Sequence, residues 1–353
     1  MVKNSSKLRT IREIISIYNS KTNDKLKKWL NGSAEYGYTT NRNKDIFRSI
    51  GIIPRVLKNF STSNSSCSFF GSEISSPFLI APMGGISQFN SKAEFIISEA
   101  AEKAKIPYFF PNNSCYSLTE INCGHKKNYL YRALYLDSDL DYCKKNILEA
   151  EEFNCKAIAI TVDSPVRPVS YNKTDTGYDS RRHYKKFGLK EPVKNQNKSD
   201  PINWKVIEYV RKITKKPIIL KGILSWKDAK VAANLGVNGI WISNHGGRNL
   251  ETDITSIEVI EEIRAAVSKK VKLIVDGGIR TGTDIFKTLS LGADFVAIGR
   301  PVVYGLAAGN RQGVDKMIEL FAHELLSTMR ICGVKVLDEI NKSFIVNRLN
   351  RLR

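Results

Sequence analysis

From Pro77 onward the chain alternates between two kinds of apolar pattern. Runs of roughly four to eight apolar residues, typical of buried strands, are followed by longer segments whose apolar positions recur at helical spacing. The strands predicted from the short runs are 77–82, 106–111, 129–136, 156–162, 216–221, 238–243, 272–276 and 294–299. The helices predicted from the longer segments are 92–104, 138–152, 202–214, 226–236, 256–268, 283–291 and 312–331.

Eight strand–helix units predict an α/β fold of the (β/α)8 barrel type, because continuously apolar parallel strands need helices to cover their outer face. An open doubly wound sheet is the alternative, but no GxGxxG fingerprint follows the first strand. Helical spacing within 7–31 predicts two further helices before any strand. We therefore expect one domain over 1–353, with 1–76 as an N-terminal helical capping segment.

The connection after the fourth strand, 165–203, is unusually long, rich in lysine and arginine, and has little apolar periodicity. A connection of this length is typical of a lid or a disordered segment. Because it leaves the carboxyl end of a barrel strand, where binding loops gather, we interpret it as a lid over the barrel mouth.

Composition changes this picture little. The 42% of hydrophobic and 25% of charged residues are ordinary for a globular protein. The net charge of +20, from 55 Lys+Arg against 35 Asp+Glu, favours anionic partners. The basic residues are scattered, however, so we expect no nucleic-acid partner, while an anionic membrane surface stays open.

Neither the cysteines nor the apolar runs indicate a special class of protein. The six cysteines form no CxxC pair and have no histidine at metal-ligand spacing, so neither a metal site nor a disulfide framework is indicated. No apolar run approaches the ~20 residues of a membrane-spanning helix. A cytoplasmic location is the expectation.

The sixth strand runs directly into a polar turn that carries His245 and Arg248. Histidine exchanges a proton near neutral pH, and arginine offers a fork of donors to a carboxylate. Gly246 and Gly247 lie between them and leave no Cβ to obstruct a flat ligand. A glycine turn after a core strand with a surface arginine is the alternative interpretation.

Similar polar residues follow the other strands of the carboxyl half, and in a barrel they face one mouth. Each has a structural explanation alone, as a helix cap or a turn residue. Together, the glycines supply main-chain N–H groups and the arginines supply charge for a phosphate. The residues at these strand ends are Asp163, Lys221, Ser243, His245, Asp276, Gly277, Gly278, Arg280, Gly299 and Arg300.

Over roughly residues 29 to 345 these motifs resemble the FMN-dependent α-hydroxy acid oxidase and dehydrogenase family, which includes glycolate oxidase, lactate oxidase and flavocytochrome b2. The most specific segments are 243–248 (SNHGGR), 276–284 (DGGIRTGTD) and 297–301 (AIGRP), and the weaker ones are 80–82 (IAP), 161–165 (TVDSP) and 221–222 (KG).

The resemblance implies FMN as cofactor and a role for each residue. His245 would take the substrate hydroxyl proton while a hydride passes to flavin N5, Asp163 would stabilise the imidazolium, and Arg248 would hold the substrate. Lys221 would stabilise reduced flavin. The remaining cofactor-binding residues implied are Pro82, Met83, Gly84, Arg132, Thr161, Ser243, Asp276, Gly277, Gly278, Arg280, Gly299 and Arg300. A homo-oligomer, a tetramer by resemblance, is also implied.

Departures from the family pattern fall on the substrate side. Trp29 and Leu134 stand where the family has two tyrosines, Arg132 replaces a glutamine, and Pro111 replaces a serine after the second strand. The second carboxylate-binding arginine falls at Ser170, with Arg167 nearby. The predicted substrate-binding residues are Trp29, Leu134, Arg167, His245 and Arg248.

We therefore expect an FMN-dependent oxidoreductase that removes a hydride from a carbon bearing OH or NH2, with an altered substrate pocket. Loss of buried donors leaves a small hydroxy carboxylate poorly satisfied. The substrate is then a small molecule or a peptide-derived group, as in peptide natural-product maturation. A simple L-2-hydroxy acid oxidase or dehydrogenase, and a catalytically lapsed flavin-binding or anion-binding protein, are the alternatives.

Overall fold

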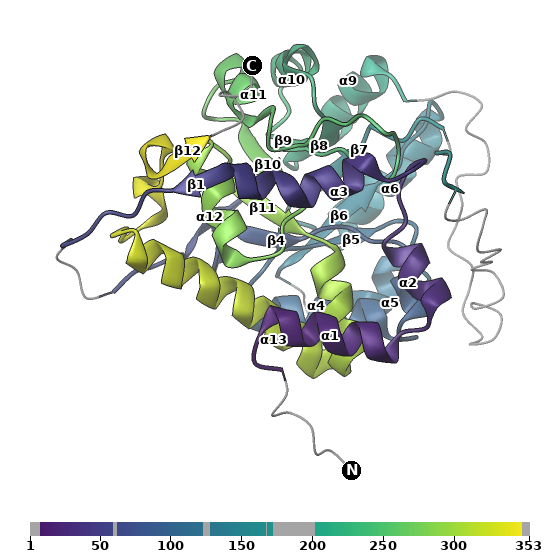
Figure 1. The fold of residues 1–353 in the computed structure, drawn as a ribbon. Helices are drawn as coiled ribbons and strands as arrows, with labels where there is room; N and C mark the ends of the chain where they lie inside the picture. The colour runs from purple at the N-terminus through teal and green to yellow at the C-terminus, as the bar shows by residue number, and fades with distance from the viewer. Residues whose placement is uncertain (1–7, 59–61, 123–127, 167, 172–201, 348–353) are drawn as a thin grey trace.

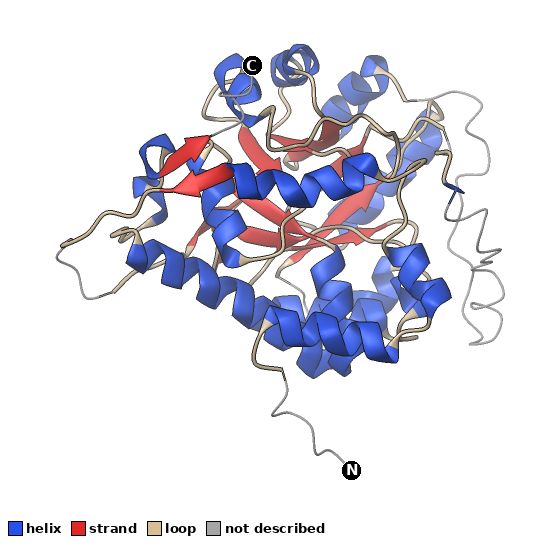
Figure 2. Ribbon diagram, in the orientation of Figure 1, coloured by secondary structure: helices blue, strands red, loops and turns tan. Residues whose placement is uncertain are grey.

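The computed structural model describes residues 8–58, 62–122, 128–166, 168–171 and 202–347. Its centre is a closed barrel of eight parallel strands in the order β10-β11-β4-β5-β6-β7-β8-β9, drawn in red within blue helices in Figure 2. The strands are β4 (Phe78–Ile80), β5 (Tyr108–Pro111), β6 (Leu130–Leu134), β7 (Ile158–Thr161), β8 (Ile218–Ile223), β9 (Gly239–Ile242), β10 (Lys272–Val275) and β11 (Phe295–Ile298). The predicted barrel and all eight of its strands are confirmed.

Helices cover the outside of the barrel, as the alternating pattern predicts. They are α4 (Ala93–Ala104), α5 (Leu118–Asn122), α6 (Leu140–Glu152), α9 (Trp204–Ile213), α10 (Trp226–Asn234), α11 (Ile260–Ala266), α12 (Gly282–Ser290) and α13 (Arg300–Ile331). The short α5 was not predicted. Helix α13 starts at Arg300, twelve residues earlier than expected, and is interrupted by non-helical backbone at Gly309 and Asn310.

The barrel interior is filled by side chains from alternate strand positions. Phe109, Tyr131, Trp241 and Ile274 are fully buried there. A hairpin of β2 (Cys67–Phe69) and β3 (Ser72–Ile74) adds Phe69, whose ring packs edge-on against Tyr131 and Phe295. The barrel is therefore filled by side chains toward the amino ends of its strands, and a ligand can bind only at their carboxyl ends.

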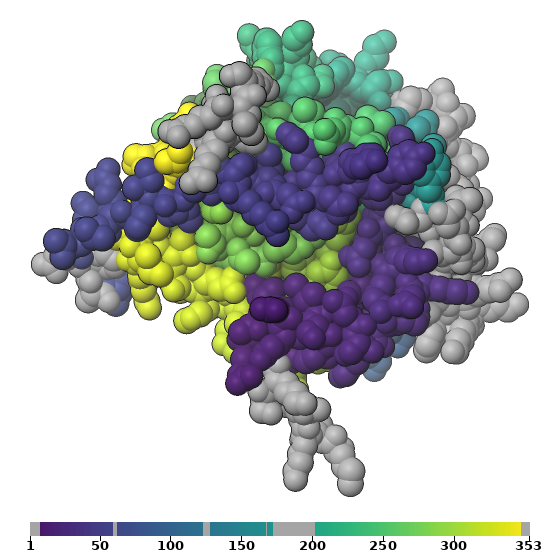
Figure 3. All heavy atoms as spheres, viewed as in Figure 1, coloured from purple at the N-terminus to yellow at the C-terminus, as the bar shows by residue number. Residues whose placement is uncertain are grey.

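The N-terminal segment forms α1 (Ile11–Lys21), α2 (Asp24–Leu30) and α3 (Tyr38–Asp45), followed by the 3-10 turn η2 (Ile46–Ser49). Thr10 and Asn23 cap the first two helices through their side chains, as polar residues at these positions commonly do. Helix α1 packs along α13, so segments far apart in the sequence lie side by side (Figure 1). Figure 3 shows the purple and blue N-terminal atoms lying against green and yellow later segments.

The remaining elements are a two-stranded sheet and several short turns. Strand β1 (Ile50–Ile52) pairs antiparallel with β12 (Ile345–Asn347). Short 3-10 turns are η3 (Ile86–Gln88), η4 (Leu337–Glu339) and η5 (Lys342–Phe344). Within the described ranges, no helix has the length and apolarity needed to cross a bilayer. Most of the predicted lid, 165–203, lies outside the described residues.

Candidate active site

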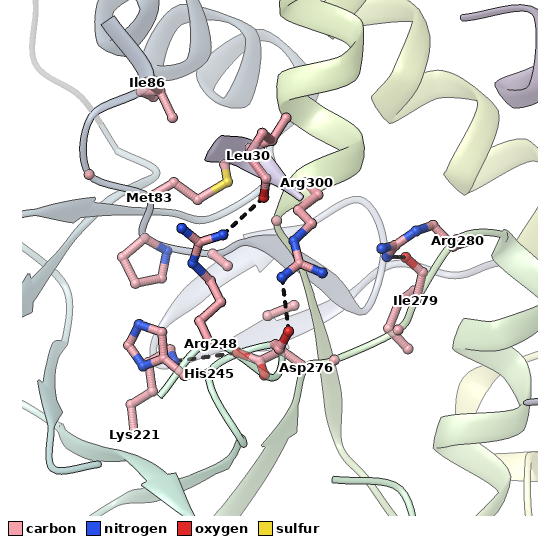
Figure 4. A pocket seen from close by; sticks show the side chains of 18 of the residues that line it. Leu30, Met83, Ile86, Lys221, His245, Arg248, Asp276, Ile279, Arg280 and Arg300 are labelled. Atoms are coloured by element: carbon pink, nitrogen blue, oxygen red, sulfur yellow. Dashed lines mark hydrogen bonds and ion pairs between the residues drawn. The ribbon is translucent and has the colours of Figure 1, made fainter. Parts of the chain in front are cut away.

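A cavity opens at the carboxyl ends of the strands and brings most of the predicted site residues together. In Figure 4, His245 and Lys221 lie at one end of it, Arg280 lies at the other, and Arg300 lies between them. The predicted residues that line it are Trp29, Pro82, Met83, Gly84, Lys221, His245, Arg248, Asp276, Gly277, Gly278, Arg280, Gly299 and Arg300. Gly246, expected to leave room for a flat ligand, also lines it, and so do Leu30, Ala81, Ile86, Ile279 and Ala297, which were not predicted.

His245 and Asp163 form the imidazole–carboxylate pair that the sequence predicts. Nδ1 of His245 lies 3.1 and 3.2 Å from the two carboxylate oxygens of Asp163, so this nitrogen carries the proton and Nε2 is left as the acceptor. Burial raises the pKa of Asp163, but His245 and Lys221 lower it more, and its net pKa lies below its ordinary value. Asp163 therefore stays ionised and orients the ring for proton acceptance at Nε2.

Tyr135 is a site residue that the sequence analysis missed. Its hydroxyl lies 3.2 Å from Nε2 of His245, the nitrogen that faces the cavity. Burial raises the pKa of Tyr135 to about 12, so the group stays a phenol and a donor at neutral pH. The alternation of side chains along the third barrel strand was the signal for it, because Tyr131 and Ala133 already face the interior.

Leu134 was predicted to bind the substrate and Arg132 to bind the cofactor. Both predictions were wrong, because both side chains lie on the outer side of the barrel. Leu134 belongs to the core cluster between the barrel and its helices. Arg132 also lies on that outer side, where it forms a 3.1 Å salt bridge with Glu149 of α6 and packs over Phe110. Residues of one strand that differ by one position face opposite sides of the sheet, so Tyr135, and not Leu134, reaches the mouth. Arg167 lies outside the described residues.

Lys221 is buried between two carboxylates. Its Nζ lies 3.5 Å from Oδ2 of Asp276 and 3.1 Å from Oγ of Ser243. Burial lowers the pKa of Lys221, but the nearby charges of Asp276 and Asp163 raise it more, so the ammonium is retained. Ser243 also accepts a 3.0 Å hydrogen bond from the His245 amide. Ser243 therefore contacts both residues, and Thr161 is paired with Lys221 across the β7–β8 ladder.

Asp276 has one satisfied and one unsatisfied oxygen. Oδ2 accepts a 2.9 Å hydrogen bond from the Trp241 indole. Oδ1 is buried and has no hydrogen-bond partner among the described residues. A buried carboxylate oxygen without a donor is unfavourable, so this position suits a ligand hydroxyl group.

Three guanidinium groups face the cavity: Arg248 lies near His245, Arg300 lies in the middle and Arg280 lies at the opposite end (Figure 4). Burial, and then the charges of Arg248 and Arg280, lower the pKa of Arg300 to about 9. Within the described part of the chain, none of the three arginines forms a salt bridge with a carboxylate. Close like charges without a counter-charge favour an anion between them, and Gly277 and Gly278 line the same cavity.

Arg248 does more than face the cavity. Its Nη1 donates to the main-chain oxygens of Leu30 and Gly32, both at 2.9 Å, at the carboxyl end of α2. Its guanidinium carbon lies 5.9 Å from the centre of the Trp29 ring. Arg248 therefore fixes Trp29 at the boundary between the first cavity and a second one.

The second cavity shares its inner wall with the first. Trp29, Pro82, Gly84, His245 and Arg248 line both. The outer part of the second cavity adds mainly neutral side chains, namely Ser33, Asn113, Tyr135, Ser164, Val166, Pro168, Ser170 and Asn249. Ser170, at the position of the family's second arginine, donates a 2.8 Å hydrogen bond to the Ser33 main-chain oxygen.

Two glycines of the site also allow a close approach of helix α3. A Cβ at Gly247 would overlap Thr40, and a Cβ at Gly278 would overlap the main chain of Asn43. Both glycines thus make room for helix α3, which lies against the loops after β9 and β10. A Cβ at Gly246 would meet Arg300 at 3.4 Å.

Comparisons with known proteins agree with this arrangement. Residues 19–347 match the FMN-dependent dehydrogenase family. The chain is 34% identical over 327 residues to 2-hydroxyacid oxidase 2 of Rattus norvegicus, covering 90% of this chain and 92% of the relative. It is 33% identical over 338 residues to a peroxisomal (S)-2-hydroxyacid oxidase of Arabidopsis thaliana, with 92% of each chain covered.

Solved structures give the same result. A mandelate oxidase with benzoyl-formic acid superposes with a TM-score of 0.86 at 30% identity, covering 93% of this chain and 96% of that one. The chain therefore belongs to the family of FMN-dependent 2-hydroxyacid oxidases and dehydrogenases.

Proposed function

We propose that this protein uses FMN to oxidise the carbon that bears the hydroxyl group of a 2-hydroxy acid or a close derivative, giving the 2-oxo product. The observation that carries the proposal is the His245–Asp163 pair, which leaves Nε2 of His245 as an acceptor in a cavity with a retained ammonium at Lys221 and a cationic far end. A base, a buried cation and an anion site in one cavity suit this chemistry.

The cavity suits FMN residue by residue. The arginines 280 and 300 and the N–H groups of Gly277 and Gly278 would hold the phosphate, and the unpartnered Oδ1 of Asp276 would accept from a ribityl hydroxyl. Lys221 and the loop of Pro82, Met83 and Gly84 would border the ring. Bound FMN supplies a two-electron acceptor.

The protein's own residues would handle the proton. Nε2 of His245 accepts the substrate hydroxyl proton, and Asp163 stabilises the imidazolium that results. Tyr135 donates a hydrogen bond at the same position, which would orient the substrate oxygen. Arg248 faces both cavities and would bind the carboxylate or carbonyl next to the oxidised carbon.

The substituent of the substrate would occupy the second cavity. Among the described residues that line it, Arg248 is the one arginine and no lysine is present. The hydroxyl and amide groups of Ser164, Asn113 and Asn249 favour a neutral group there. We therefore propose a substrate with an uncharged substituent larger than that of glycolate.

The test is the visible spectrum of the purified protein, followed by anaerobic addition of glycolate, lactate, mandelate, mandelamide and peptide-linked hydroxy acids. We expect a yellow protein whose flavin bleaches with at least one member of the panel. Replacing His245 by alanine should slow bleaching by about 10²- to 10⁴-fold, whereas His323→Ala, at an exposed histidine on α13, should leave it unchanged. A protein that binds FMN but never bleaches would favour the catalytically lapsed alternative.

A further inference from the structure

Glu94 is a buried carboxyl group outside both cavities. It lies in the first turn of α4, and its side chain is fully buried. Its Oε1 accepts hydrogen bonds from the hydroxyl of Ser87 at 3.2 Å and from that of Ser114 at 3.3 Å. Ser87 Oγ also lies 3.1 Å from the thiol of Cys115. One oxygen of Glu94 thus joins residues of two different loops.

Both loops lead directly to the mouth of the barrel. Residues 81–92 join β4 to α4 and include Gly84, which lines both cavities. Residues 112–117 join β5 to α5 and include Asn113, which lines the second cavity. The loops are in close contact there, because a Cβ on Gly84 would overlap the Asn113 side chain. Any shift between the loops would move both residues at the mouth.

Burial of the Glu94 carboxyl group costs folding free energy, so a role in stability does not explain why it is there. Oε2 of Glu94 and the hydroxyl of Tyr108 are buried and have no hydrogen-bond partner among the described residues. Burial raises the pKa of Glu94 to about 7. An acidic residue in the first turn of a helix is favourable, but an exposed one gives that benefit without desolvation.

We propose that Glu94 is a positioning residue that fixes the β4–α4 loop against the β5–α5 loop and so sets the position of Gly84 relative to Asn113. A second link, the 2.6 Å hydrogen bond from the Tyr116 hydroxyl to the Ser91 main-chain oxygen, lies at the far ends of the same loops. Glu94 is the link nearer to the mouth. Its effect on catalysis rests on the proposed function, whereas its effect on the loops does not.

Cys115 reports on this contact. Its side chain is 7% exposed, and Cys143, on α6, is 0% exposed and serves as an internal reference. Iodoacetamide labelling of both thiols, followed by peptide mass spectrometry at several pH values, gives a rate for each thiolate. The variants are Glu94→Ala, Glu94→Gln and the control Glu99→Gln, which makes the same change at an exposed ion pair on α4.

In Glu94→Ala we expect the ratio of Cys115 to Cys143 labelling to rise at least about tenfold, because the carboxyl oxygen that both Ser87 and Ser114 contact is lost and the loops separate. Glu94→Gln keeps one acceptor oxygen and should show a smaller rise, and Glu99→Gln should show none. An unchanged ratio in Glu94→Ala, or a parallel rise of both thiols, overturns the proposal. If Glu94→Ala does not fold, Ser114→Ala removes one of the two links and is judged by the same ratio.

Kinetics with saturating FMN separate positioning from plain destabilisation. With the panel substrate that bleaches the flavin fastest, Glu94→Ala should raise KM about tenfold and lower kcat by a smaller factor, because the chemical groups stay in place. An unchanged KM with a lower fraction of active protein overturns the role at the mouth. A protein that oxidises no substrate contradicts the proposed function, yet the thiol ratio still decides the loop contact.

Discussion

The backbone of His245 is held in an unfavourable conformation by contacts on both sides. Its φ angle of 57° lies in the left-handed region, which for a residue other than glycine costs about 1–3 kcal/mol. The amide N–H donates to Ser243, two residues earlier in the same loop, and the ring donates to Asp163, which follows β7. The strain is therefore offset by the same contacts that aim Nε2 into the cavity.

Removal of the Tyr135 hydroxyl tests the donor at that nitrogen. Tyr135→Phe should slow anaerobic flavin reduction about 5- to 100-fold, since a hydrogen bond near the reacting oxygen is lost. Stopped-flow absorbance measures this rate. Tyr131→Phe is the matched control, because that hydroxyl donates to the Phe69 main-chain oxygen at the closed end of the barrel. Equal slowing by both variants would contradict the role given to Tyr135.

For single residues, the sequence predicted which side chains belong to the site better than it predicted which side of a strand each one faces. His245 and Asp163 follow strands closely and Lys221 lies near the carboxyl end of β8, so their placement at one mouth could be predicted from the barrel alone. The family motif points to Leu134, whereas the alternation of side chains along the strand favours Tyr135. A displacement of one residue cannot be detected from composition, but the two-residue period of side chains reveals it.

At the scale of elements, helix α3 is the part of the site that sequence patterns could not predict. Its sequence, YTTNRNKD, has no apolar stripe and contains two β-branched residues. The helix is stabilised by distant groups: Glu251 accepts hydrogen bonds from the N–H groups of Gly37 and Thr39, and Asn43 exchanges two hydrogen bonds with Asn244. These contacts join residues about 200 positions apart, so a local sequence pattern does not reveal them.

Gly278 makes the docking of α3 testable. Gly278→Ala should lower the free energy of unfolding by roughly 2–5 kcal/mol, because the residue has a φ of +81° and its Cβ would overlap Asn43. Urea unfolding measures this change. Gly71→Ala is the control, since Gly71 has the same φ of +81° and no atom within 4 Å of its Cβ. If both variants lose equal stability, backbone strain alone explains the effect and the close approach of α3 has no role.

For the molecule as a whole, Glu94 predicts how stability depends on pH. Its pKa of about 7 in the folded protein exceeds its ordinary value of 4.5, so the folded state keeps a proton that the unfolded chain has already lost between these values. Stability from this group is therefore present at low pH and falls as pH rises from about 4.5 to 7, by on the order of 3 kcal/mol. Cys115 and Tyr108 do not titrate in this range, because burial raises the pKa of both.

Urea unfolding of wild type and Glu94→Gln across pH 4.5 to 8 isolates this contribution, since glutamine cannot titrate. The stability of the wild type relative to the variant should fall over that range and then become constant above pH 8. A difference that does not change with pH would show that Glu94 has an ordinary pKa.

The cationic end of the main cavity predicts which part of a flavin stabilises the fold. Arg248, Arg280 and Arg300 repel one another, and a phosphate between the last two would relieve that repulsion. FMN at one hundred times its dissociation constant should stabilise the protein by about 2.7 kcal/mol. Riboflavin at the same concentration should give much less, because it lacks the phosphate.

Arg300→Gln should remove most of the difference between the two flavins, since it deletes one charge of the cluster and leaves the ring-binding end intact. Arg311→Gln is the control, because Arg311 lies on α13 in a partly exposed ion pair with Glu99. Equal stabilisation of the wild type by riboflavin and FMN would mean that the arginines do not bind the phosphate. The arginines would then have to bind another anion. The proposal that the flavin phosphate lies at the arginine end and the ring at the Lys221 end would be wrong.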